Sequence, residues 1–229
     1  MTCKGVFFDL YGTLLEFTDI DRAWAAWQEA FLTAMHHYAR DLPEEQFIET
    51  LGSFFEGPIE QFSADSLSPY EARLVNYVGS FRIELSREQV RDVAERTVSC
   101  WHQYVSLDAS AETVLAEIRR RRKTALVSNF DYPSFVHRLI KRHGLDLHFD
   151  HITVSGDLGI EKPDPRIFGP SLAATGLEAS EVIYLGDSRE DIEGAKKAGM
   201  RPVLIDRAGD SGLEAVKIGR LEEILDLLD

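Results

Sequence analysis

The sequence predicts an α/β protein in which a Rossmann-like, doubly wound parallel sheet carries an inserted α-helical cap subdomain. Three observations predict this fold class. Short apolar, β-rich runs recur along the chain, helical segments separate the later runs, and one long, mostly helical stretch follows the first run. Strands that alternate with helices are typical of a parallel sheet, because parallel neighbours need a crossover connection.

Five apolar runs are predicted to be strands, each short enough for a buried strand. They lie at residues 5–8, 124–127, 151–154, 182–185 and 202–205. Four segments of helical pattern lie between or just before the later runs, at residues 111–122, 134–143, 165–175 and 190–198. This alternation predicts a doubly wound sheet, whose ligands bind at the carboxyl ends of the strands.

The long stretch between the first two strands is predicted to be the cap. It is mostly helical, with breaks at 52–53, 57–58, 66–69 and 86, where Gly, Pro or Ser occurs. The expected division is therefore a core at 1–15 and 105–229 and a helical cap at 16–104. One apolar stripe at spacings of three and four predicts a helix that packs on a core: Trp24, Trp27, Phe31, Met35 and Tyr38.

The amino-acid composition indicates what kind of protein this is and excludes several classes. Apolar residues make up 44% of the chain and charged residues 28%, which is typical of a folded globular protein. Cys3 and Cys100 are too few for a disulfide scaffold, so a reducing, cytoplasmic location is expected. No run is long enough to predict a membrane span. The net charge of −14 argues against a nucleic-acid partner, and the basic run at 119–123 is expected to end a helix.

The first strand leads directly into Asp9-Leu10-Tyr11-Gly12-Thr13. Its position predicts that the Asp9 carboxylate emerges at the carboxyl edge of the sheet. An Asp before a Gly-Thr turn is, by itself, explained equally well by turn chemistry. Further segments are needed to favour a catalytic role.

Two of these segments supply hydrogen-bond donors and a positively charged side chain. Ser128 and Asn129 end the second strand, where a hydroxyl and an amide suit an oxyanion; the alternative is that Asn129 or Asp131 caps the next helix. Lys162 lies in a loop whose prolines restrict the chain, and Pro165 suits the first position of a helix. Such a lysine neutralises crowded carboxylates, unless it is an ordinary solvated loop residue.

The fourth strand ends at Gly186-Asp187-Ser188, and Asp191 follows. With Ser188 at the N-cap, Asp191 falls in the first helical turn and is explained by a capping box. Asp187 has no such explanation, and it is expected beside Asp9. Carboxylates crowded at one edge need a cation between them, and Mg²⁺ is the natural choice because it prefers oxygen ligands.

Taken in order, these four segments resemble the haloacid dehalogenase-like (HAD) hydrolase superfamily, in which one type of cap is inserted between the first and second motifs. The resemblance implies a metal-binding hydrolase in which Asp9 attacks the substrate and water later hydrolyses the aspartyl intermediate. It implies that the metal ligands are Asp9, Asp187 and the main-chain carbonyl of Tyr11, with Asp191 in support. The expected catalytic and substrate-binding residues are Asp9, Tyr11, Thr13, Ser128, Asn129 and Lys162.

One departure from the family pattern bears on the reaction. Phosphatases of the superfamily usually carry a second Asp two residues after the nucleophile, which protonates the leaving group; here that residue is Tyr11. The 2-haloacid dehalogenases share the Asp-x-Tyr-Gly-Thr pattern, and a halide leaves without a proton. Those enzymes also hold the substrate carboxylate with a cap arginine, for which Arg22 and Arg40 are candidates. Phosphonatase chemistry is excluded, because it requires a cap lysine that forms a Schiff base and the cap region has no lysine.

The predicted metal site counts for more than Tyr11 in the choice between phosphatase and dehalogenase. The reason is that the metal ligand at position 11 is a main-chain carbonyl, which does not depend on the side chain there. The prediction is a Mg²⁺-dependent phosphatase that acts on a small phosphorylated metabolite through an aspartyl-phosphate. The alternatives are a metal-independent 2-haloacid dehalogenase and a non-catalytic binding protein on the same fold. The identity of the substrate and the oligomeric state have no readable signature in the sequence.

Overall fold

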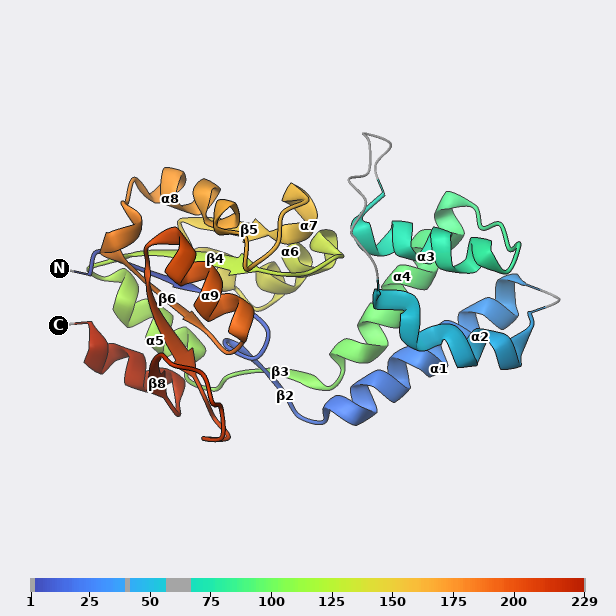
Figure 1. Cartoon of the computed structure of the whole chain (residues 1–229), viewed down its shortest axis with the longest axis horizontal. Helices are drawn as coiled ribbons and strands as arrows, with labels where there is room; N and C mark the ends of the chain where they lie inside the picture. Colours follow the sequence, from blue (N-terminus) through green and yellow to red (C-terminus); the bar gives the residue numbers. More distant parts are fainter. Residues whose placement is uncertain (1–2, 40–41, 57–66, 229) are drawn as a thin grey trace. The chain divides into compact units, whose positions relative to one another are not determined.

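The computed structural model describes residues 3–39, 42–56 and 67–228. The chain forms two compact units (Figure 1): unit 1 comprises Met1–Glu16 and Ser106–Asp229, and unit 2 comprises Phe17–Val105. The chain crosses between them twice, and the division expected from the sequence differs by one residue at each crossing.

Unit 1 is built on a parallel sheet of six strands in the order β5-β4-β1-β6-β7-β8. The strands are β1 (Gly5–Phe8), β4 (Lys123–Ser128), β5 (His151–Val154), β6 (Val182–Gly186), β7 (Arg201–Ile205) and β8 (Val216–Ile218). The order reverses between β1 and β6, which makes their carboxyl ends the topological switch point where such sheets bind ligands. The predicted fold class, a Rossmann-like doubly wound sheet, is confirmed.

Helices cover both faces of this sheet, so its central strands are buried on both sides. Figure 1 shows α8 on one face and α5 on the other. The helices are α5 (Ala111–Arg119), α6 (Pro133–Arg142), α7 (Ser155–Leu158), α8 (Gly169–Thr175) and α9 (Arg189–Ala198). One core cluster joins Phe7 of β1 and Tyr184 of β6 to Phe168 and Ala195, which come from the segments that cover that face.

Unit 2 is helical, with α1 (Ile20–Tyr38), α2 (Glu44–Thr50), α3 (Pro69–Ser80) and α4 (Arg87–His102). The predicted stripe on α1 is buried at Trp27, Phe31 and Met35, whereas Trp24 is 40% exposed. Tyr38 donates a hydrogen bond to Asp92. Two expected breaks are helix starts, since Ser68 and Ser86 cap α3 and α4 with complete capping boxes. The breaks expected at 57–58 and at 66 lie outside the described residues.

Several elements differ from the sequence prediction. Three strands were not predicted: β8, and the pair β2 (Leu15–Phe17) and β3 (Val105–Leu107) at the two crossings. The helix predicted at 165–175 is a 3₁₀ turn, Pro165–Phe168, followed by α8. Pro170 lies in the first turn of α8, where its missing N–H leaves no donor unpaired.

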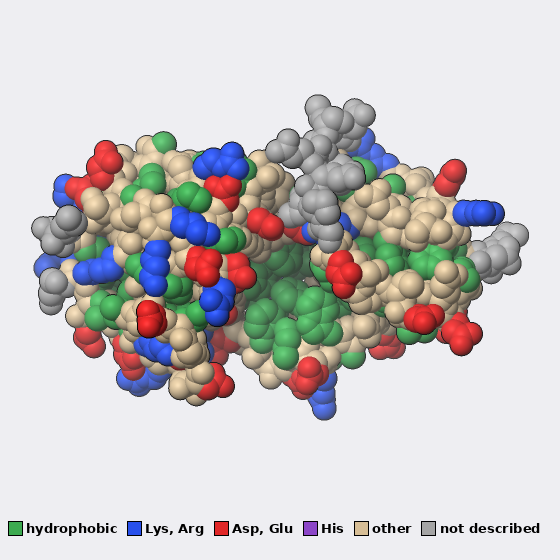
Figure 2. Space-filling view, viewed as in Figure 1, with side chains coloured by type: hydrophobic (Ala, Val, Ile, Leu, Met, Phe, Trp, Pro, Cys, Tyr) green, Lys and Arg blue, Asp and Glu red, His purple; other side chains and the backbone are tan. Residues whose placement is uncertain are grey.

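The basic run at 119–123 was predicted to end a helix, and its first part does so, with Arg119 as the last residue of α5 and Arg120 as its C-cap. α5 ends there, and Lys123 already belongs to β4, where its ammonium lies 3.1 Å from an oxygen of Asp150. Figure 2 shows Lys and Arg side chains interspersed with Asp and Glu over the visible face of unit 1. Among the described helices, none is both long and apolar enough to cross a membrane.

Candidate active site

Asp9 lies at the switch point of the sheet. It follows β1 directly, and its main-chain N–H donates to the Leu185 carbonyl of β6 at 2.9 Å. Its side chain is almost completely buried, with the residue 5% exposed. The nucleophile predicted from the sequence is therefore held by two neighbouring strands.

Lys162 is the central cation of the site. Its Nζ lies 2.5 Å from Oδ1 of Asp9 and 2.7 Å from Oδ1 of Asp191. The residue is 4% exposed, so the alternative of a solvated loop lysine is wrong. Burial lowers the pKa of Lys162, but the two carboxylates outweigh burial and raise it above its ordinary value. Lys162 therefore stays charged between Asp9 and Asp191.

Asn129 holds the loop that carries Lys162. Its Oδ1 accepts from the Lys162 N–H at 2.9 Å, and its Nδ2 donates to the Lys162 carbonyl at 3.1 Å. This amide was expected to face an oxyanion, whereas in the structure it bonds to the main chain of Lys162. The helix-capping alternative is wrong, because Tyr132 occupies the N-cap of α6.

Asp191 is both a helix cap and a member of the site. Its Oδ2 accepts from the Ser188 hydroxyl at 2.7 Å and from the main-chain N–H groups of Ser188 and Asp187, which completes the predicted capping box. Its Oδ1 faces Lys162. Gly186 makes this approach possible, since a Cβ there would lie 2.3 Å from the Asp191 carboxyl carbon.

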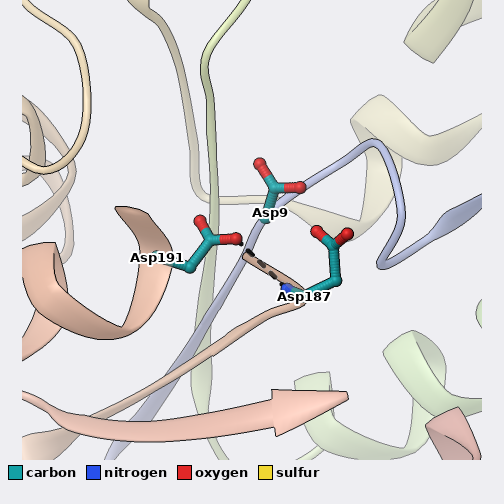
Figure 3. A group of neighbouring side chains, drawn as sticks. All are labelled: Asp9, Asp187 and Asp191. Atoms are coloured by element: carbon teal, nitrogen blue, oxygen red, sulfur yellow. Dashed lines mark hydrogen bonds between the residues drawn. The ribbon is translucent and has the colours of Figure 1, made fainter. Parts of the chain in front are cut away.

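Three carboxylates, from Asp9, Asp187 and Asp191, converge at the edge of the sheet (Figure 3). One oxygen from each lies within 4.8 Å of the others. Burial and the neighbouring carboxylates raise the pKa of Asp9 to about 8, although Lys162 opposes them. Desolvation and Asp191 raise the pKa of Asp187 to about 6. Three carboxylates thus lie together while the Lys162 ammonium contacts two of them, and the deficit of positive charge fits a divalent cation with oxygen ligands.

The hydrogen bonds that the carboxylates already accept indicate which of them would bind such an ion. Both oxygens of Asp191 already accept hydrogen bonds, from Lys162 on one side and Ser188 on the other. Asp187 is exposed, and in Figure 3 its carboxylate points toward Asp9. The arrangement favours Asp9 and Asp187 as ligands, with Asp191 in support.

Two buried hydroxyls at the site have no hydrogen-bond partner within residues 3–39, 42–56 and 67–228. They are Oγ of Ser128, at the end of β4, and Oγ1 of Thr13, in the loop after Asp9. The residues are 1% and 0% exposed. A buried hydroxyl without a partner is costly, so both are suited to donate to a bound anion.

The Tyr11 ring is stacked on Phe130, with the ring centroids 4.9 Å apart and the planes 17° apart. Burial, together with the nearby Asp9 carboxylate, raises the pKa of Tyr11 above its ordinary value. The phenol is therefore a weaker proton donor than tyrosine in water. Position 11 therefore carries a buried phenol where a carboxylic acid would be expected in a phosphatase of the superfamily that the sequence resembles.

Two residues that contact the site residues were not predicted from the sequence. The Tyr184 hydroxyl, in the middle of β6, donates to the Val127 carbonyl at 2.9 Å and lies 3.1 Å from both Asp191 and Lys162. Its signal was a tyrosine in an otherwise apolar strand, because a buried hydroxyl needs a partner. Arg207 donates to main-chain carbonyls of the loop after Asp9. Its signal was a cation just past the fifth predicted strand, at the same edge of the sheet.

Arg22, one of the two arginines proposed for a dehalogenase, belongs to unit 2. Arg22 lies in the first turn of α1, where its side chain is 76% exposed and pairs with Asp19 at 3.3 Å. Arg40 lies outside the described residues.

Comparison with known proteins supports the family assignment. The sequence model of haloacid dehalogenase-like hydrolases matches residues 3–199. A phosphoserine phosphatase from Thermus thermophilus is 30% identical over 225 residues, 89% of each chain. A phosphoglycolate phosphatase from Pectobacterium atrosepticum is 31% identical over 149 residues, 63% of each chain.

Solved structures share the fold at lower identity. A 2-haloacid dehalogenase from Pseudomonas syringae is 21% identical with a TM-score of 0.70, covering 99% of this chain and 98% of that one. A HAD phosphatase from Thermococcus onnurineus is 24% identical with a TM-score of 0.66, covering 98% and 97%. These likenesses show the fold alone. The family match over most of the chain shows more: this protein is a hydrolase and belongs to the haloacid dehalogenase-like family.

Proposed function

We propose that this hydrolase is a Mg²⁺-dependent phosphatase that cleaves small phosphate monoesters through an aspartyl-phosphate on Asp9. The observation that carries the proposal is the convergence of the Asp9, Asp187 and Asp191 carboxylates at one edge of the sheet, where the Lys162 ammonium contacts two of the three, Asp9 and Asp191. A carboxylate at Asp187 adds repulsion to the site unless a cation binds there. The phosphatase names of the relatives reported above point the same way. We also propose that unit 2 is the cap of this family.

In the first step, each of the site residues has its own role. The Asp9 carboxylate attacks phosphorus, a new P–O bond forms, and the ester P–O bond breaks with its electron pair going to the leaving oxygen. Lys162, held against Asp9, balances the charge that develops on the phosphoryl group. The hydroxyls of Ser128 and Thr13 donate to the phosphoryl oxygens.

In the second step, water attacks the phosphorus of the aspartyl-phosphate, which releases phosphate and restores Asp9. Asp9, Asp187 and the Tyr11 carbonyl would hold Mg²⁺, with Asp191 in support. When bound, the ion supplies positive charge that keeps the carboxylates ionised and stabilises charge on the phosphoryl oxygens. Asp9 must be ionised to attack, and without a cation its pKa is raised to about 8.

The second candidate, a 2-haloacid dehalogenase, is favoured by Tyr11. In that reaction Asp9 attacks the carbon that bears the halogen, the halide leaves, and water hydrolyses the ester. The raised pKa of Tyr11 fits a reaction in which the leaving group needs no proton. Against it, Asp187 has no role in a metal-independent site.

A substrate panel tests the two candidates. The purified protein is assayed with p-nitrophenyl, acyl and alkyl phosphates and with 2-haloacids, each with Mg²⁺ and with a chelator; Asp9→Asn is the control for contaminating enzymes. We expect phosphate release that requires Mg²⁺ and is absent in the variant. Halide release in chelator would favour the dehalogenase instead. No turnover of either class would favour a binding protein.

A further inference from the structure

Arg207 is a cation outside the predicted site that holds several groups at once. It follows β7, and its side chain is 27% exposed. Nη1 donates to the Gly12 carbonyl at 2.5 Å, and Nη2 donates to the Thr13 carbonyl at 2.9 Å. The same guanidinium pairs with Asp108 at 2.8 Å and with Glu16 at 3.1 Å. One side chain therefore contacts two carbonyls and two carboxylates.

These partners come from three stretches of chain around the site. Gly12 and Thr13 belong to the loop that follows Asp9. Glu16 is the last residue of unit 1 before the outgoing crossing, and Asp108 lies just after the return crossing. The Asp108 N–H also donates to the Leu14 carbonyl at 2.9 Å. Arg207 thus ties the nucleophile loop to both connections with unit 2.

Only an arginine satisfies this set of acceptors. The guanidinium has five N–H donors in a planar fork, whereas an ammonium is a single point charge with three. Burial and the Asp108 carboxyl raise the pKa of Glu16, which Arg207 opposes. The cation is therefore needed between these two acids as well as at the carbonyls.

The loop held by Arg207 is in direct contact with the carboxylate cluster. Gly12 has φ +83°, and a Cβ there would lie 2.1 Å from Oδ2 of Asp187. The main chain of Gly12 is therefore packed between Asp187 and Arg207. Thr13, with its buried hydroxyl, comes next, and Tyr11, with its proposed carbonyl ligand, comes before. A small shift of this loop would displace several proposed functional groups together.

We propose that Arg207 is a positioning residue for the nucleophile loop: its guanidinium fork holds residues 10–14 in the geometry that phosphoryl transfer requires, without contacting the substrate. Its effect on turnover rests on the proposed phosphatase function. Its effect on the loop itself does not. Displacements of about 1 Å at an active site can cost about 10²-fold in rate, which sets the expected size of the effect.

The test compares three variants. Arg207→Ala removes all the contacts, and Arg207→Lys keeps the charge and much of the length while removing the fork. Arg201→Ala is the matched control, because Arg201 lies at the start of the same strand and donates to the Leu227 carbonyl, away from the loop. Each variant is assayed with p-nitrophenyl phosphate and Mg²⁺, and amide hydrogen exchange is followed in the peptide that covers residues 10–17.

We expect both Arg207 variants to lose about 10²-fold in kcat with KM within about twofold, and to exchange faster in residues 10–17 but not elsewhere in the sheet. Arg201→Ala should match the wild type in both readouts. Wild-type kcat and exchange in Arg207→Lys would overturn the proposal, as would an equal loss in Arg201→Ala. If the wild type hydrolyses no phosphate ester, the proposed function fails. In that case amide hydrogen exchange alone tests the positioning role of Arg207. Faster exchange confined to residues 10–17 in the Arg207 variants supports this role, and unchanged exchange overturns it.

Discussion

Removing one oxygen atom from Tyr184 tests how the hydroxyl beneath the site contributes to stability and to rate. Tyr184 is completely buried, and its ring packs edge-on against Phe168 with the centroids 4.9 Å apart. Tyr184→Phe keeps this ring packing. It removes the hydrogen bond to the Val127 carbonyl and the contacts with Lys162 and Asp191. The variant should therefore fold, with a polar defect confined to the site.

The size of the defect follows from those contacts. Loss of a buried hydrogen-bonding group costs about 1–3 kcal/mol. For a chain of this length each kcal/mol lowers Tm by about 2–4 °C. Lys162 keeps both carboxylates, so turnover should suffer only the loss of one net hydrogen bond. A loss of about 0.5–1.5 kcal/mol corresponds to a fall in kcat of about 2- to 10-fold.

Urea unfolding measures the first effect and steady-state hydrolysis of p-nitrophenyl phosphate the second. Tyr70→Phe is the matched control, since Tyr70 is a buried residue of unit 2 whose hydroxyl accepts from the Trp27 indole N–H at 2.7 Å. It should lose similar stability and keep the wild-type kcat. The reasoning is refuted if Tyr184→Phe is as stable as the wild type, or if Tyr70→Phe loses as much kcat.

Three further outcomes are expected. Asp9→Asn should abolish turnover of phosphate esters and 2-haloacids, because an amide cannot form either covalent intermediate; phosphate or halide release at the wild-type rate would contradict the assignment. Tyr11→Asp should raise hydrolysis of alkyl phosphates more than that of p-nitrophenyl phosphate, by up to about 10²- to 10⁴-fold, since only the poor leaving group needs an acid; equal changes in the two kcat values would count against a vacant acid position. Burial raises the pKa of the Asp150 carboxyl, but the Thr124 N–H and Lys123 outweigh burial and lower this pKa overall. The ionised carboxylate therefore stabilises the fold at pH values above the ordinary carboxyl pKa, and this stability is lost as the pH falls through the lowered pKa of Asp150. Asp150→Asn should therefore cost about 1 kcal/mol in urea unfolding at pH 7 and nothing at a pH below that range; a constant difference at every pH would refute this.

Five of the six strands of the sheet, and the main residues that meet at its edge, could be predicted from the sequence alone. Five strands were readable because a strand buried on both faces must be a continuous apolar run. The residues after those runs were then expected together, since parallel strands bring their carboxyl ends to one edge. Asp9, Lys162, Asp187 and Asp191 do meet there. The departure at Tyr11 was equally a property of the sequence, because it concerns which chemical group is present.

The tertiary structure decided which polar groups pair with one another. Asn129 bonds to the main chain of Lys162, which is 33 positions away. Arg207 bonds to Gly12, which is 195 positions away. The three-residue strands β2, β3 and β8 likewise depend on a partner. Apolar periodicity is a local property that survives in a linear sequence, whereas a hydrogen bond requires distance and direction between atoms that only the folded chain brings together.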